Sequence, residues 1–360
     1  MRGWMGKTKV FFVFTLLALF LAGCGIENLT ALEPKGYGAE KSMDLIILTT
    51  LIMTGVFVVV MVIYVITLVR FRRKKGQEDY VPKQVEGNHK LEVIWTVIPI
   101  ILVLVIAVPT VLATFDLADD SKADELINVN VKGNQYWWHF EYAGEEIQTS
   151  QDLYIPTGER VYLHMLSSDV IHSFWVPSIS GKMDVNAENV NTMYIEAYDE
   201  GVYWGKCAEL CGPSHSLMDF KVIAVSPEEY DEWVNDMQNV DADAEPENAV
   251  AQEGQELFEA NNCMNCHATD SAASGIEAGP QNNGPFGPNL TNFGDRSRVA
   301  GILEHNKENL VDWIMDPESI KPGNKMTGQY PDLSQDEAES IAEYLLQLQP
   351  SEITPESAGD

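Results

Sequence analysis

Two long apolar runs dominate the first third of the sequence. The first covers residues 45–69 and the second residues 93–113, and neither contains a charged side chain. About 20 apolar residues are enough for a helix to cross the ~30 Å hydrocarbon core of a bilayer. The two prolines of the second run do not argue against a helix there, because membrane helices tolerate proline. The pattern predicts a two-helix transmembrane hairpin at 44–69 and 92–114.

The charges that flank these runs indicate how the hairpin is oriented. The first run is followed directly by five basic residues: Arg70, Arg72, Arg73, Lys74 and Lys75. Basic clusters mark the cytoplasmic end of a membrane helix. We therefore expect residues 70–91 to form a cytoplasmic loop and the segments before 44 and after 115 to share the outer side. Glu92 lies in the first turn of the second helix, where the helix dipole alone favours a carboxylate.

The N-terminus has the features of an export signal at residues 1–23. Three basic residues precede a short apolar run at 10–21, which is too short to span a bilayer comfortably. The sequence Leu-Ala-Gly-Cys that ends at Cys24 resembles the bacterial lipobox, which implies cleavage before Cys24 and acylation of that residue. A plain signal anchor with an unmodified cysteine is the alternative. Residues 24–43 would then form a segment on the outer face.

A different pattern begins after residue 125. Apolar and polar residues alternate along 126–131, 160–165 and 193–197, which is the period of half-buried strands. Glycine, asparagine and aspartate separate these stretches, as expected for turns. Residues 125–230 are therefore predicted to form an antiparallel all-β sandwich or barrel.

The rest of the chain is predicted to be helical and is strongly acidic. A helix is expected to begin at Pro227, residues 231–250 read as an acidic linker, and residues 251–350 are expected to form an all-α domain. The net charge of the chain is −31, with 11 basic and 46 acidic residues after residue 115. This balance argues against nucleic acid as a partner. It favours basic partners or an external surface that faces high pH, and the sequence does not choose between them.

A cluster of soft ligands points to copper. The loop Cys207 to Met218 reads C-x-E-x-C-x-x-x-H-x-x-M and holds four candidate ligands, Cys207, Cys211, His215 and Met218. Thioether ligation suits copper, whereas zinc usually takes four sulfur or nitrogen ligands. A second imidazole, His172, lies upstream. A mononuclear blue-copper site needs one cysteine, so two cysteines favour a pair of coppers. A Cys207–Cys211 disulfide is the alternative.

A second motif indicates haem. Cys263, Cys266 and His267 form C-x-x-C-H, the attachment site of c-type haem, in which the histidine becomes the proximal iron ligand. A thioredoxin-like pair is disfavoured, because no βαβ pattern surrounds the motif. The sixth iron ligand should be Met or His. Met326 lies in a loop free to bend over the haem and is preferred to Met315 and His305.

The two motifs carry a family resemblance. The stretches D-V-I-H-S-F around His172 and C-A-E-L-C-G-P-S-H-S-L-M from Cys207 resemble subunit II of haem–copper cytochrome c oxidases, whose cupredoxin-like domain carries the dinuclear CuA centre. The resemblance implies that Cys207 and Cys211 bridge two coppers and that His172 and His215 each bind one. Met218 and the backbone carbonyl of Glu209 would be weak axial ligands. The Glu209 side chain would also offer a ligand to a magnesium ion shared with subunit I.

The C-terminal region has its own resemblance. The pattern W-I-x-x-P-x-x-I-K-P-G-x-x-M and the Gly-Pro-Asn-Leu segment at 287–290 resemble class I cytochrome c domains. This implies Met326 as axial ligand and a hydrogen bond from His267 to the carbonyl of Pro288. A copper domain joined to a cytochrome c domain fits the caa-type oxidases, so the chain is expected to bear two coppers and one haem c.

Two further segments resemble the family's. Residues 92–99 match E-x-I-W-T-x-x-P, in which the glutamate stands at the mouth of the K proton channel, here Glu92. The aromatic run Tyr136, Trp137 and Trp138 resembles G-x-Q-W-Y-W, whose first aromatic takes electrons from cytochrome c. That position is Tyr136 here rather than Trp, so Trp137 is a substitute candidate. Trp138 is equally compatible with core packing.

The resemblance implies a bacterial membrane enzyme of several subunits. The copper and haem domains would lie on the outer face and deliver electrons to subunit I, where dioxygen becomes water and protons are pumped. Subunit III and a small subunit IV are further expected partners, and the donor would be a small cytochrome c or a quinol:cytochrome c reductase. Quinol oxidase subunit II is disfavoured because it lacks the copper ligands. Nitrous oxide reductase is disfavoured because seven histidines are too few. A tethered electron carrier or copper-delivery protein remains the alternative.

Overall fold

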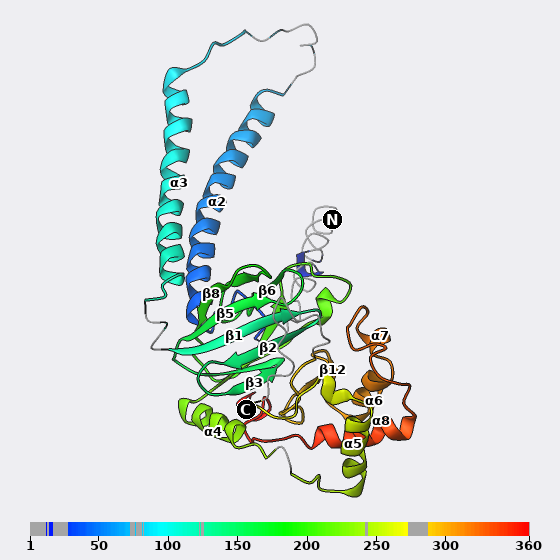
Figure 1. The fold of residues 1–360 in the computed structure, drawn as a ribbon. Coiled ribbons are helices and arrows are strands. Elements are labelled where there is room, and N and C mark those ends of the chain that lie inside the picture. The colour runs from blue at the N-terminus through cyan, green and yellow to red at the C-terminus, as the bar shows by residue number, and fades with distance from the viewer. Residues whose placement is uncertain are drawn as a thin grey trace.

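The computed structural model of the chain describes residues 28–72, 83–121, 126–241, 244–272 and 287–359, together with a few isolated positions. Figure 1 shows two long helices that project side by side from a β domain, and a smaller helical domain beside that β domain. Cys24 lies outside the described residues, as does most of the basic cluster after the first helix.

The two projecting helices are α2 (Tyr37–Arg70) and α3 (His89–Leu117). They extend beyond the expected 44–69 and 92–114, mainly at the ends that lie next to the β domain. Their apolar side chains are almost all exposed in the isolated chain, as expected of surfaces that face lipid. The side chain of Asn88 caps α3 by accepting hydrogen bonds from the backbone N–H groups of Lys90 and Leu91.

The base of the hairpin is tied to the β domain by polar contacts. Tyr37 Oη donates to Asp116 Oδ2 over 2.7 Å, which joins the two helices. The ring of Tyr194 lies against Tyr37 with 6.0 Å between centroids, and Tyr194 Oη donates to the Asp116 backbone carbonyl over 3.4 Å. The Arg160 guanidinium also lies 5.0 Å from the Tyr37 ring centre. These contacts join the β domain to the base of the two helices.

The β domain is a sandwich of two five-stranded sheets, with strand orders β3-β2-β1-β5-β8 and β4-β10-β9-β6-β7. The strands are β1 (Ile127–Asn134), β2 (Trp137–Tyr142), β3 (Ile147–Ser150), β4 (Asp152–Pro156), β5 (Val161–Ser167), β6 (His172–Trp175), β7 (Lys182–Val185), β8 (Asn191–Ile195), β9 (Gly201–Cys207) and β10 (Phe220–Val225). Between the sheets, the rings of Trp138, Phe174 and Phe220 pack with centroids 4.7–5.7 Å apart. These aromatic rings form a packed core between the two sheets.

The prediction of a purely antiparallel domain is wrong at two pairings. β1 pairs in parallel with β5, and β10 pairs in parallel with β4. Period-2 alternation shows that a segment is a half-buried strand, but it carries no information about the direction of its neighbour. The direction depends on connections that cross between the two sheets.

The helix expected at Pro227 is α4 (Pro227–Gln238), which begins with a capping box between Ser226 and Glu229. Trp233 is fully buried and stacks on Tyr154 with 4.6 Å between ring centroids. The β domain thus continues to Gln238, so the first part of the expected 231–250 linker is a packed helix. Its buried positions 230, 233 and 237 follow a helical period that the acidic composition obscured.

The second domain is built mainly from helices around the haem-attachment motif. Its elements are α5 (Ala249–Ala260), the short 3-10 helix η3 (Cys263–Asn265), α6 (Lys307–Met315), α7 (Pro317–Ile320) and α8 (Gln335–Leu346). Helices α5 and α8 approach closely at Gly254, where a Cβ would lie 1.9 Å from the carbonyl oxygen of Ser340. A two-stranded ribbon, β11 (Arg298–Val299) with β12 (Leu303–Glu304), adds to the expected all-α fold.

The chain returns to the β domain after α8. Ser351 Oγ donates to Asp236 Oδ2 on α4 over 2.7 Å, and Ile353 and Ala358 pack against the β-domain core. The tail ends in a short 3-10 helix, η4 (Ser357–Gly359). Figure 1 shows the C-terminus beside α4 and the β sheets. The haem-motif domain is therefore connected to the β domain at both of its ends.

His139 gives the β domain a predicted sensitivity to acid. The side chain is buried in β2, and burial together with the nearby charge of Lys132 lowers the pKa of His139 to about 3. The imidazole of the unfolded chain has a pKa of ~6.5. Between the two pKa values the folded state therefore binds fewer protons than the unfolded state. The folded state loses stability as the pH falls below the pKa of the unfolded chain. We expect His139→Leu to remove about 2 kcal/mol of the stability change between pH 7 and pH 5. Urea unfolding followed by tryptophan fluorescence checks this; equal pH dependence in both proteins would contradict it.

Candidate metal and haem centres

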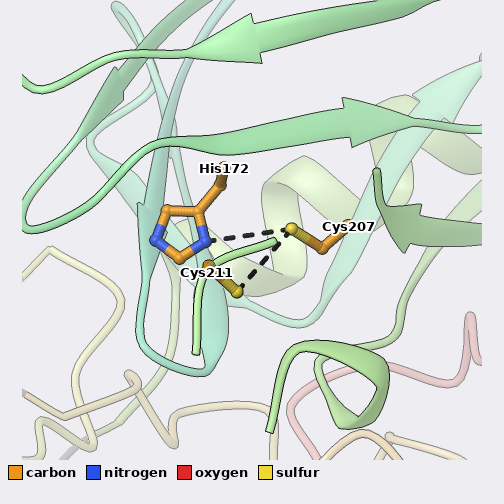
Figure 2. A group of neighbouring side chains, drawn as sticks. All are labelled: His172, Cys207 and Cys211. Carbon is orange, nitrogen blue, oxygen red and sulfur yellow. Dashed lines mark hydrogen bonds between the residues drawn. The ribbon is translucent and has the colours of Figure 1, made fainter. Parts of the chain in front are cut away.

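Two antiparallel strands bring the candidate copper ligands together. His172 begins β6 and Cys207 ends β9, and these strands pair so that Phe174 lies opposite Cys207. Figure 2 shows the imidazole of His172 facing Cys207, with Cys211 beside them. His172 Nδ1 lies 3.9 Å from Cys207 Sγ, and the two sulfurs of Cys207 and Cys211 lie 4.0 Å apart. The ligand atoms of these three buried residues all lie within 4.8 Å of one another.

The remaining sequence-predicted ligands close the same site. Cys211 Sγ lies 3.6 Å from His215 Nδ1 and 3.3 Å from Met218 Sδ, while Cys207 Sγ lies 3.3 Å from the carbonyl oxygen of Glu209. The Glu209 side chain is exposed, so only its backbone faces the sulfurs. The structure therefore gathers all six predicted positions around one small volume.

This donor set fits a soft metal ion such as copper, and its two cysteines do not form a disulfide. A disulfide requires about 2.05 Å between sulfurs, and Cys207 and Cys211 are free at 4.0 Å. Since metal–sulfur bonds are about 2.3 Å long, two sulfurs at this spacing can bind the same ion. Burial and the neighbouring Cys207 raise the pKa of the Cys211 thiol to about 12, so a second thiolate requires a cation beside it.

Residues around the ligands fix their orientation, and sequence reasoning did not assign these roles. Asp169 Oδ1 lies 2.8 Å from His172 Nε2, so the other ring nitrogen faces the sulfurs. Gly133 leaves room for the imidazole, because a Cβ there would lie 2.9 Å from His172 Cδ2. Trp138 lies edge-on to His172, with 6.0 Å between ring centroids, and its Nε1 donates to the carbonyl of Met218 over 3.2 Å. Asp169 stands three residues before His172, and this spacing could have indicated that the two side chains interact.

A large cavity lies next to the haem-attachment motif. Its walls include Cys263, Cys266, His267 and Met326, and it encloses about 1320 Å³ of empty space, part of it open to solvent. His267 Nδ1 lies 2.8 Å from the Pro288 carbonyl oxygen, as the family resemblance implies. These residues fit a covalently attached haem, because two free thiols and a half-buried imidazole line the same apolar cavity.

Of the three sixth-ligand candidates, Met326 alone lines this cavity. The side chain of Met315 is 42% exposed at the end of α6. His305 lies against the ring of Phe293, with 5.2 Å between centroids, and is absent from the cavity wall. The Met326 backbone N–H donates a hydrogen bond to Asn324 Oδ1 over 2.9 Å. This bond constrains the loop that carries the methionine.

The cavity is shared between the two domains. Gln135, Tyr136, Trp137 and Gln151 of the β domain form part of its wall. Tyr136 is only 3% exposed and Trp137 9%, because the cytochrome-like domain covers them. Trp138 is fully buried next to the candidate copper ligands His172 and Met218. All three aromatic candidates for electron acceptance are therefore covered by this chain rather than presented to an outside protein.

Glu92 lies in the first turn of α3, away from both centres. Its carboxylate is 3.9 Å from His89 Nδ1, and the side chain is about half exposed. This geometry agrees with a carboxylate that stabilises the start of a helix. The role of Glu92 in proton uptake stays a prediction.

Comparison with known proteins matches three parts of the chain to family models. Residues 38–112 match "Cytochrome C oxidase subunit II, transmembrane domain", residues 144–225 match "Cytochrome C oxidase subunit II, periplasmic domain", and residues 251–349 match "Cytochrome c". Cytochrome c oxidase subunit 2 of Bacillus sp. (strain PS3) is 49% identical over 352 residues, which cover 94% of this chain and 97% of that protein. The corresponding protein of Bacillus subtilis (strain 168) is 47% identical, covering 94% and 96%.

A more distant relative is quinol oxidase subunit 2 of Bacillus cereus. It is 33% identical over 225 residues, which cover 62% of this chain and 77% of that protein. The relatives that extend over nearly the whole chain, including the haem motif, are thus cytochrome c oxidase subunits.

Proposed function

Because this chain belongs to the cytochrome c oxidase subunit II family and carries a cytochrome c domain, we propose that it accepts electrons at its own haem c and delivers them through a dinuclear copper centre to subunit I. Reduction of dioxygen to water, coupled to proton pumping, would take place in that other subunit. The observation that carries this proposal is the cavity beside the C-x-x-C-H motif, which Tyr136 and Trp137 of the copper domain help to enclose.

The copper ligands are proposed residue by residue. Cys207 and Cys211 would bridge two coppers, with His172 on one ion and His215 on the other. Met218 and the Glu209 carbonyl would complete the two ions as axial ligands. Support comes from the convergence of these atoms, with contacts of 3.3–4.0 Å among them. A bridged copper pair supplies one-electron transfer, and the strands and Asp169 hold its ligands in place.

The haem ligands are proposed in the same way. Cys263 and Cys266 would bind the haem through thioethers, and His267 and Met326 would be the axial ligands. The Pro288 carbonyl, 2.8 Å from His267 Nδ1, would fix the orientation of the proximal imidazole. Burial lowers the pKa of His267, which favours the neutral ring that binds iron.

The finer features of the assembly are proposed from the family resemblance. We propose that the soluble domains face outside, that lipid on Cys24 assists anchoring, and that the exposed Glu209 carboxylate offers a magnesium ligand at the border with subunit I. Glu92 would admit protons to subunit I from the cytoplasmic side. Subunits III and IV are proposed partners, as are a small cytochrome c or a quinol:cytochrome c reductase as donor.

Analysis of the full chain purified in mild detergent tests the proposal. Two coppers and one haem c per chain are expected, together with co-purification of a membrane protein of many spans that binds haem. A chain that purifies alone with both centres loaded would favour the alternative of a tethered electron carrier. One copper per chain, or zinc in its place, would contradict the dinuclear assignment.

A further inference from the structure

A single loop of the cytochrome domain makes polar contacts with three parts of the copper domain. We call residues 321–326, which end at Met326, the docking loop. Lys321 Nζ donates to the Tyr136 carbonyl over 2.9 Å, Ser214 Oγ donates to the Pro322 carbonyl over 2.7 Å, and Lys325 Nζ pairs with Asp169 Oδ2 at 2.8 Å. Tyr136 precedes β2, Ser214 belongs to the copper-binding loop, and Asp169 precedes His172.

Asp169 joins the docking loop to a proposed copper ligand. One of its carboxylate oxygens lies 2.8 Å from His172 Nε2, and the other accepts from the Gln135 backbone N–H over 2.9 Å as well as from Lys325. The side chain of Asp169 is 12% exposed, whereas that of Lys325 is 50% exposed, so the ion pair is shielded from water only on the side of the aspartate. The contacts of Asp169 with His172 and Gln135 fix the direction from which Lys325 can approach.

The same loop packs closely against Tyr136. Gly323 has a φ of +75°, and a Cβ there would lie 3.5 Å from Tyr136 Oη and 3.6 Å from Pro213 Cγ. On the other side of the phenol, a Cβ at Gly212 would lie 2.4 Å from Tyr136 Oη. The Tyr136 ring therefore fills the space between the docking loop and the copper-binding loop.

The charge of the two domains gives Lys325 a local role. The chain after residue 115 has 46 acidic and 11 basic residues, so its two soluble domains repel each other overall. Lys325 is adjacent in sequence to Met326 and reaches an acidic residue that contacts His172. It supplies a local attraction at the point where the two candidate centres approach.

We propose that the docking loop holds the cytochrome domain on the copper domain in one orientation, and that the Lys325–Asp169 pair is its positioning contact. Electrons then pass between the centres inside one chain, through the interface that Tyr136 fills. The inference rests on the proposed function, and it adds the residues that set the relative position of the centres. Lys325 and Asp169 are positioning residues, because their effect on transfer acts through the geometry of the interface.

Lys325→Glu in the purified, fully loaded protein tests this. The new carboxylate would face Asp169, and like charges in contact are strongly unfavourable, so internal electron transfer from haem to copper should slow by about tenfold or more. The absorption spectra of both centres should stay unchanged. Backbone amides of residues 321–326 should exchange hydrogen at least about tenfold faster, which is a readout independent of turnover.

A rescue variant and a matched control separate docking from general charge effects. Adding Asp169→Asn to Lys325→Glu should restore most of the rate, because the amide can accept from His172 and donate to the new glutamate. Lys307→Glu is the control: Lys307 pairs with Glu343 at the same 2.8 Å, but inside the cytochrome domain. It makes the same change in net charge and should leave transfer and exchange unaltered.

Other outcomes overturn the inference. The pair does not act by docking if the Lys325→Glu variant transfers electrons at the wild-type rate or has a changed copper spectrum. The same conclusion holds if Lys307→Glu slows electron transfer as much as Lys325→Glu does. Absence of haem-to-copper transfer in the wild-type chain would instead defeat the proposed function, so the two failures are distinguishable.

Discussion

Replacing His215 by alanine is expected to abolish the near-infrared mixed-valence absorption of the copper centre while the haem spectrum persists. His215 Nδ1 lies 3.6 Å from Cys211 Sγ and is the only histidine in the copper-binding loop. In the proposed site, its loss would leave one of the two coppers without a nitrogen ligand, and the pair would no longer share an electron evenly. Since loss of a supporting residue alone costs 10–100-fold in metal affinity or activity, loss of the ligand should lower electron delivery to subunit I at least about 100-fold.

The measurement is absorption and electron paramagnetic resonance spectroscopy of the purified variant, with copper counted per haem. His164→Ala is the matched control, because His164 is a half-buried histidine of the same domain that bonds Asn128 over 3.0 Å. The control should retain two coppers and the mixed-valence band. An intact band in His215→Ala would remove His215 from the ligand set and with it the proposed pairing.

Replacing Met326 by leucine is expected to have the second large effect. The haem should stay attached through Cys263 and Cys266, but the ligand-field absorption of a methionine-bound haem should disappear. Methionine ligation raises haem potentials, and axial ligands set them over a range of about 0.8 V. The potential should therefore drop by on the order of 0.1 V or more, which makes the haem a poorer acceptor for its donor.

Redox titration of the haem, followed by its visible absorption, checks this result. Met315→Leu provides the control, since Met315 is 42% exposed at the end of α6 and does not line the cavity. An unchanged ligand-field spectrum in Met326→Leu, or a change in Met315→Leu, would show that the axial assignment is wrong.

The two motifs could be predicted because their chemistry is local in sequence. Cys207 to Met218 and Cys263 to His267 hold most of their ligands within a few residues, so spacing alone identifies them. His172 is identified through its neighbouring residues in the family motif. The membrane helices were equally accessible, because an uncharged apolar run of more than 20 residues is long enough to span a bilayer and is rare in soluble domains.

What the sequence did not predict depends on contacts between distant segments. The Lys325–Asp169 pair joins residues 156 positions apart and exists only because two domains dock. The parallel pairing of β1 with β5 depends on how the chain crosses between sheets. The covering of Tyr136 has the same origin: its position in an aromatic run suggested an exposed contact for another protein, and the chain's own second domain occupies that place.

The return of the tail to the β domain has a consequence for the kinetics of electron transfer between the two centres. The chain leaves that domain after Gln238 and is held to it again by Ser351 and Ile353, so the intervening hundred or so residues are tethered at two points. A module tethered in this way meets its target at an effective concentration in the millimolar range or above. The step from haem to copper should therefore keep its rate on dilution of the enzyme, whereas any step that awaits a freely diffusing reductant should not.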